Sequence, residues 1–143
     1  MTAREYLSQV RLYDIRLHQL QEQYDRLRAD ASGMRSIGIN PDKVQGSGDG
    51  DPMARTVSEF VDLEERIRKL FGDLFRLRSK IIGEIQQMDD PRYEQVLYYR
   101  YILFYRLDKI ADTMRKTDGD VYSHQYIRRL HFEALLAFQN KFL

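Results

Sequence analysis

Apolar residues recur every three or four positions along the beginning of the chain, between charged and polar side chains. They alternate four- and three-residue steps without a break: Tyr6, Val10, Tyr13, Leu17, Leu20, Tyr24 and Leu27. A period of about 3.5 residues keeps one narrow stripe of a helix facing a partner helix over several turns. The pattern predicts a long coiled-coil-like helix whose role is structural.

A second apolar stripe of the same kind follows further along the chain: Phe60, Leu63, Ile67, Leu70, Leu74, Leu77, Ile81 and Met88. Between the two stripes, residues from about 35 to 52 are rich in Gly, Pro, Asp and Ser, which end a helix and favour a flexible loop. Pro52 suits a first helical turn, with Asp51 placed to cap it. The two helices satisfy each other most simply as a long antiparallel helical hairpin over residues 1–89.

Further apolar residues lie beside the two stripes, namely Leu12, Ile15, Phe71 and Phe75. A two-helix seam does not cover them, and exposed apolar area of this kind indicates a contact with something else. We therefore expect the hairpin to pack on another helix or on a second copy of the chain, which makes a homo-oligomer the expected state.

Shorter helices follow from residue 90 to residue 143. Asp90 and Pro91 suit a helix start, and the third helix, over residues 92–104, carries an apolar side made of Tyr93, Leu97, Tyr101 and Phe104. The fourth helix is short and amphipathic: Leu107, Ile110, Ala111 and Met114. A polar turn, KTDGDVYS, then leads to Ser123, a good N-cap for a last helix.

The last helix has two different faces. Its inward stripe is Ile127, Leu130, Ala134, Leu135 and Phe138, and His131 beside this stripe is expected to be a packed interior histidine. Its first two turns leave a polar and basic face outward: His124, Gln125, Arg128 and Arg129. The chain is therefore predicted to be all-α, with a hairpin over 1–89 and a second domain over 90–143.

The C-terminal segments match a known pattern. The runs YEQVLYYRY, LDKIADTM and YSHQYIRRLHFEALLAF resemble region 4 of bacterial sigma factors. The matching residues are Glu94, Val96, Leu97, Tyr99, Arg100, Tyr101, Leu107, Ile110, Ala111, Met114, Ser123, Ile127, Ala134 and Leu135. Over nearly its whole length the chain is also similar to small phage and prophage regulators of Gram-positive bacteria, which join a helical pair to a sigma-like helix-turn-helix.

This resemblance implies a non-enzymatic protein that binds double-stranded DNA sequence-specifically and regulates transcription of phage or prophage genes. It also implies contact with host RNA polymerase. In a helix-turn-helix, the first residues of the second helix reach base edges in the major groove. The expected DNA-binding residues are Ser123, His124, Gln125, Arg128 and Arg129, with Arg115 and Lys116 as phosphate contacts. One departure is the turn after Met114, about six residues longer than in the family, which loosens the angle between the two helices.

Composition adds mainly exclusions. The net charge is +1, with 14 basic and 16 acidic residues over 1–91 and 9 basic and 6 acidic over 92–143, so charge alone gives weak support for nucleic acid. There is no cysteine, no signal peptide and no apolar run of membrane-spanning length, so a cytoplasmic protein away from the membrane is expected. The spacing of His18, His124 and His131 fits no metal motif. No nucleophile has a base nearby, so neither a cofactor nor catalysis is expected.

Two other functions remain open at this stage. The chain could be a phage packaging or assembly component similar to a small terminase, in which the hairpin forms a ring and the helix-turn-helix holds DNA with little sequence preference. It could also be a protein-interaction module in which the longer turn has abolished DNA binding. The sequence specifies neither the target DNA nor the choice between activation and repression.

Overall fold

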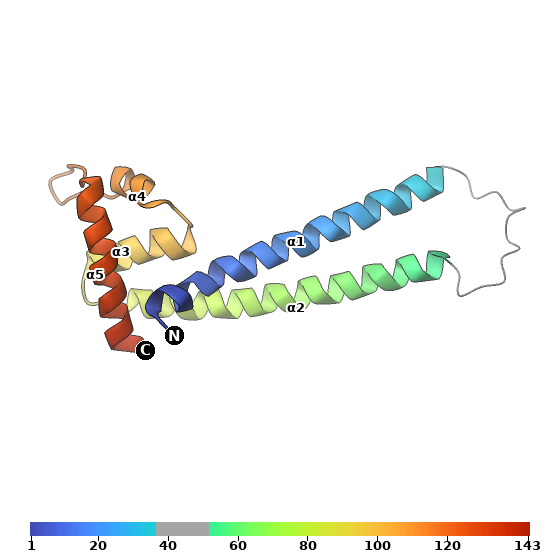
Figure 1. Cartoon of the computed structure of the whole chain (residues 1–143), viewed down its shortest axis with the longest axis horizontal. Coiled ribbons are helices and arrows are strands. Elements are labelled where there is room, and N and C mark those ends of the chain that lie inside the picture. Colours follow the sequence, from blue (N-terminus) through green and yellow to red (C-terminus); the bar gives the residue numbers. More distant parts are fainter. Residues whose placement is uncertain (37–51) are drawn as a thin grey trace, which may run out of the picture. The chain divides into compact units, whose positions relative to one another are not determined.

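The computed structural model describes residues 1–36 and 52–143, with side chains described up to Gly33 in the first range. The described residues form helices and no strand, which confirms the all-α class. The elements are α1 (Ala3–Ser36), α2 (Pro52–Gln86), α3 (Pro91–Leu97), a π-helical turn η2 (Tyr98–Ile102), α4 (Leu107–Thr113) and α5 (His124–Phe142) (Figure 1). The expected loop falls largely on residues 37–51, and the expected cap on Asp51; both predictions lie outside the described residues.

The chain divides into two compact units. The first unit contains residues 1–14 and 74–143, and the second contains residues 15–73. Each of the two long helices contributes to both units, so the first unit includes the beginning of α1 and the end of α2. The expected division between residues 89 and 90 stays a prediction.

The second unit is built from the facing stripes of α1 and α2. Leu17 is buried there, while Leu20, Leu27, Leu63, Ile67 and Leu70 are half-buried. The Tyr24 hydroxyl donates a hydrogen bond to Glu64 Oε1 (3.0 Å), and its ring meets Phe60 edge-on at a centroid distance of 5.3 Å. Apolar side chains beside the stripe stay exposed, among them Phe71 (58%), Val57 (55%) and Ile15 (43%).

The core of the first unit is assembled around α5. Phe138 is fully buried and lies 6.0 Å from the Tyr6 ring and 4.8 Å from the Phe142 ring, centroid to centroid. The backbone N–H of Ala3 donates to Gln139 Oε1 (2.5 Å), and the Tyr6 hydroxyl donates to Glu84 Oε2 (2.8 Å). Residues of α1, α2, α3, η2, α4 and α5 are fully buried in this unit: Leu7, Val10, Ile81, Ile85, Val96, Leu97, Ile102, Ile110, Ile127 and Leu130. The beginning of the chain is therefore part of the same core as its last helix.

The third helix differs from the expected single α-helix over 92–104. It begins as expected, because the Asp90 side chain caps it by accepting from the Arg92 N–H (2.9 Å) and Pro91 occupies its first turn. After Leu97 the backbone widens into η2, where the Leu103 N–H bonds to the Tyr98 carbonyl (3.2 Å). Phe104 then adopts a left-handed conformation (φ 60°) and ends the helix; Arg106, two residues later, precedes the first residue of α4.

Candidate nucleic-acid interface

Helix α5 is set in place by its cap and by its buried face. The Ser123 side chain accepts a hydrogen bond from the Tyr126 N–H (3.1 Å), as the sequence predicts, so α5 begins at His124. Ile127, Leu130, Ala134 and Phe138 are buried against the rest of the first unit, with α3 and α4 packed beside them. Figure 1 shows α4 beside the first turns of α5. This packing fixes the orientation of α5 about its own axis. It therefore also fixes the direction in which the exposed side of α5 points.

The turn between α4 and α5 is closed by backbone contacts. Arg115 and Val121 form an antiparallel bridge, and the Lys116 N–H donates to the Asp120 carbonyl (2.9 Å). Gly119 has φ +86°, a conformation that residues with a Cβ rarely adopt. The additional residues thus close on themselves as a small hairpin, with Met114 buried at its base (2% exposed).

All seven residues predicted to bind DNA are exposed. Ser123, His124, Gln125, Arg128 and Arg129 lie at the beginning of α5, whereas Arg115 and Lys116 lie in the hairpin that precedes it. Arg115 donates to the Met114 carbonyl (3.1 Å), and the Lys116 ammonium lies 5.8 Å from the centroid of the Tyr122 ring. Tyr122 in turn stacks on Tyr126 at 5.1 Å.

Carboxylates of α4 lie beside the basic residues of α5, a relationship that the sequence analysis missed. His124 Nδ1 is 3.5 Å from Asp108 and its Nε2 is 3.3 Å from Asp112, while Arg128 Nη2 is 3.8 Å from Asp108. These carboxylates come four residues apart in the sequence, which places both on one side of a short helix. That spacing was the available signal, but only the packing of α4 against α5 brings the acids next to His124 and Arg128.

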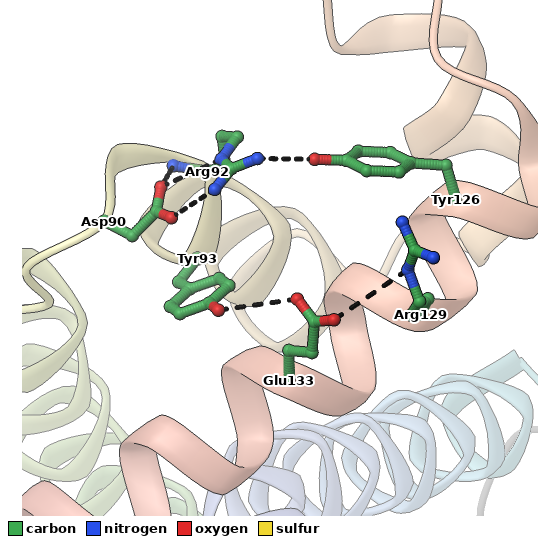
Figure 2. Close-up of polar contacts among 6 residues, drawn as sticks. All are labelled: Asp90, Arg92, Tyr93, Tyr126, Arg129 and Glu133. Carbon is green, nitrogen blue, oxygen red and sulfur yellow. Dashed lines mark hydrogen bonds and ion pairs between the residues drawn. The ribbon is translucent and has the colours of Figure 1, made fainter.

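A chain of polar contacts joins the start of α3 to α5 (Figure 2). Arg92 is held by Asp90 (2.7 Å), and its Nη1 donates to the Tyr126 hydroxyl (2.6 Å). The hydrogen bond from Arg92 lowers the pKa of the Asp90 carboxyl below its usual value. No local sequence pattern marks Arg92 or Tyr126 as partners, because their contact forms across 34 residues.

A second group of polar contacts between α3 and α5 centres on Glu133. Glu133 accepts from the Tyr93 hydroxyl (3.5 Å) and lies 3.8 Å from Arg129 Nε (Figure 2). The Arg129 guanidinium is also 5.6 Å from the centre of the Tyr126 ring. Arg129 is therefore oriented along α5 by two neighbours, whereas Arg128 points to the side of α4.

His131, expected to be an interior histidine, is 6% exposed and lies 3.0 Å from the Tyr101 hydroxyl. Burial, with smaller contributions from Arg100 and Arg4, lowers the pKa of His131 to about 4. The ring is therefore neutral near pH 7.

Within residues 1–36 and 52–143, no cluster of three or more His, Asp or Glu side chains could hold a metal ion. Over the same residues, no helix combines the length and the apolar character that crossing a membrane requires.

No protein-family model matches the sequence, and no curated protein or solved structure matches it significantly.

Proposed function

We propose that the chain binds double-stranded DNA through a helix-turn-helix formed by α4 and α5, and that it thereby regulates transcription. One observation carries the proposal. The first two turns of α5 are buried on one side, through Ile127 and Leu130, and expose His124, Arg128 and Arg129 on the other. A helix seated in this way presents its first residues as a rigid unit to the major groove.

The side chains on this face have the chemistry that base and phosphate recognition needs. An arginine can donate two hydrogen bonds to guanine O6 and N7, a contact worth about 1–3 kcal/mol of discrimination. Arg115 and Lys116 stand in the hairpin before α5, where they would contact phosphate, and Arg92 is held at the start of α3 by Asp90. The resemblance to sigma factors adds host RNA polymerase as a second partner.

The negative charges of Asp108 and Asp112 oppose DNA binding. When DNA binds, either their contacts with His124 and Arg128 break or the carboxylates stay close to the phosphates and repel them. Their contacts with His124 and Arg128 span 3.3–3.8 Å between side chains that are at least half exposed. Exposed pairs of this kind contribute about 0–1 kcal/mol. At low salt, DNA phosphates can replace the two carboxylates as partners of His124 and Arg128. The negative charges of Asp108 and Asp112 would still lower the affinity for DNA at every salt concentration.

The two long helices fit an antiparallel hairpin that supports self-association. Within the first unit Tyr6 of α1 bonds Glu84 of α2, and within the second Tyr24 of α1 bonds Glu64 of α2, so the two helices contact each other in each unit. Phe75 (65% exposed) and Phe71 (58% exposed) are large apolar side chains that a second copy of the chain would cover. A dimer would also place two recognition helices on adjacent half-sites.

Titration of full-length protein with duplex DNA at several salt concentrations tests the proposal. Binding should weaken steeply as salt rises, because bound Lys and Arg release counterions from DNA. Arg128→Ala/Arg129→Ala should lower the affinity, while Arg66→Ala/Arg68→Ala, which removes two exposed arginines of α2, should leave it unchanged. Selection from a random DNA pool then gives the target sequence. No binding at low salt, or equal binding by all three proteins, would refute DNA recognition by α5.

A second candidate is a protein-interaction module, favoured by Asp108 and Asp112 beside the basic face. The exposed apolar side chains Phe132 (59%) and Leu136 (50%) of α5 are also typical of a protein contact. The packaging alternative would require a ring of many subunits. Measurement of the oligomer mass in solution distinguishes a ring from a dimer.

A further inference from the structure

A cavity in the first unit is lined by arginines and includes none of the residues predicted to read DNA bases. Its volume is about 270 Å³, and its lining residues are Ser8, Arg11, Arg100, Tyr101, Phe104 and Arg106. They come from α1, from η2 and from the short link between η2 and α4. We call this cavity the arginine pocket.

The three arginines are held at the pocket by different parts of the fold. The Arg11 guanidinium lies 5.2 Å from the centre of the Phe104 ring, and Arg100 Nη1 donates to the Tyr105 carbonyl (3.0 Å). Arg106 is the residue that precedes α4, in an extended conformation (φ −69°, ψ 151°). One contact occupies only part of the five N–H donors of a guanidinium, so most donors of Arg100 remain for a ligand.

The backbone at the pocket is strained. Phe104 has φ 60°, a conformation that is unfavourable for a bulky residue and persists only where the surrounding structure enforces it. It follows the π-helical turn η2, a distortion that often occurs at functional sites. Strain and π-turn together bring the Phe104 ring under Arg11 and turn the chain so that Arg106 lines the same cavity as Arg100.

The pocket is positively charged without a compensating acid. No carboxylate is among its lining residues. In the described part of the chain, no ion pair involves Arg11, Arg100 or Arg106. Three other arginines of this unit have acids beside them: Arg92 has Asp90, Arg128 has Asp108 and Arg129 has Glu133. Three guanidinium groups gathered around one cavity repel each other, and a bound anion relieves that repulsion.

We propose that the arginine pocket binds a phosphate group. A guanidinium donates two parallel hydrogen bonds to a phosphate with matching geometry, and three of them suit a group with several charged oxygens better than a single carboxylate. Ser8, which lines the same cavity, carries a hydroxyl that can add a neutral donor, whereas the Tyr101 hydroxyl already contacts His131. The phosphate can belong to a DNA backbone or to a free phosphorylated compound, since both present the same oxygens.

This proposal does not depend on the proposed function. The arginine pocket uses α1, η2 and the residue before α4, whereas base recognition was assigned to the beginning of α5. The Arg128→Ala/Arg129→Ala protein should therefore lose DNA recognition and still bind phosphate in the pocket. Substitution of the pocket arginines changes no residue of α5.

The test is titration of the full chain with inorganic phosphate, at constant ionic strength against chloride, followed by NMR of the arginine Nε–H signals. Saturable shifts are expected at Arg11, Arg100 and Arg106. Arg11→Gln/Arg106→Gln removes two exposed arginines and should weaken binding roughly tenfold or more, given about 1.5–3 kcal/mol for a charged hydrogen bond. Arg66→Gln/Arg68→Gln should bind as the natural sequence does, and circular dichroism checks that each variant is folded.

A competition experiment then separates the two sources of phosphate. If a short DNA duplex displaces inorganic phosphate from the pocket, the ligand is a backbone phosphate. If the duplex leaves it bound, the ligand is a free phosphorylated compound. Either result supports a phosphate site, whereas the absence of saturable binding, or equal binding by the pocket variant and its control, overturns the proposal.

Discussion

The hydroxyl of Tyr101 and Nε2 of His131 lie 3.0 Å apart in the core of the first unit, with their rings stacked at a centroid distance of 5.7 Å. This contact joins η2 to α5 across 30 residues. It also connects two regions of interest, because Tyr101 lines the arginine pocket and His131 lies on the helix that carries the predicted DNA-binding residues.

The neutral state of His131 makes the stability of this unit depend on pH. The pKa of His131 falls from 6.5 in the unfolded chain to about 4 in the folded one, so the unfolded state binds more protons between these values. Stability is therefore present above pH 6.5 and is lost as the pH falls toward 4, by up to about 3 kcal/mol. Urea unfolding over this range should show the loss.

His131→Gln should be less stable at neutral pH but should lose less stability on acidification, since its side chain does not titrate. His18→Gln, which removes an exposed histidine of α1, serves as the control. The same dependence on pH in the His131→Gln protein as in the natural sequence would contradict the assignment.

The beginning of α1 should be essential to the fold of the C-terminal helices. Leu7 is fully buried in their core, so Leu7→Ala should reduce the free energy of unfolding by about 2–5 kcal/mol. Leu12→Ala alters a side chain of the same helix that is 52% exposed. It should change the free energy of unfolding by less than about 0.5 kcal/mol. Chemical denaturation measures both, and similar small effects would mean that residues 1–14 do not belong to this core.

Gly119 should be needed for the hairpin before α5. Its φ of +86° costs a residue with a Cβ about 1–2 kcal/mol, so Gly119→Ala should lower the thermal stability. Gly83→Ala is the matched control: Gly83 lies within α2 with no atom within 4 Å of an added Cβ. That substitution should raise stability by about 0.5–1 kcal/mol. Stabilisation by both changes would show that the turn does not hold this conformation.

Removing the acids of α4 should strengthen DNA binding. Asp108→Asn/Asp112→Asn frees His124 and Arg128 and removes two negative charges from the face, which should raise the affinity by up to about tenfold at low salt. Asp62→Asn/Glu65→Gln removes the same charge from α2 and controls for net charge. Weaker binding after the change in α4 would indicate that these carboxylates take part in recognition.

The sequence alone determined the helices and their inward faces. The three- and four-residue steps from Tyr6 to Leu27 give the stripe of α1 that is buried or half-buried, although they omit the buried Leu7. Asp90, Pro91 and Ser123 give the starts of α3 and α5. Local rules suffice for these features, because an apolar stripe and an N-cap depend on residues within a few positions of each other. The burial of His131 followed from its place beside the stripe of α5.

Only the tertiary structure decided which elements share a core and which charges meet. It joined Tyr6 to Phe138, brought Asp108 and Asp112 beside His124 and Arg128, and gathered Arg11, Arg100 and Arg106 around one cavity. The left-handed Phe104 and the turn η2 likewise carry no glycine or proline signal in the sequence. Such contacts depend on how helices distant in the chain pack together, and no period or cap within one helix encodes that packing.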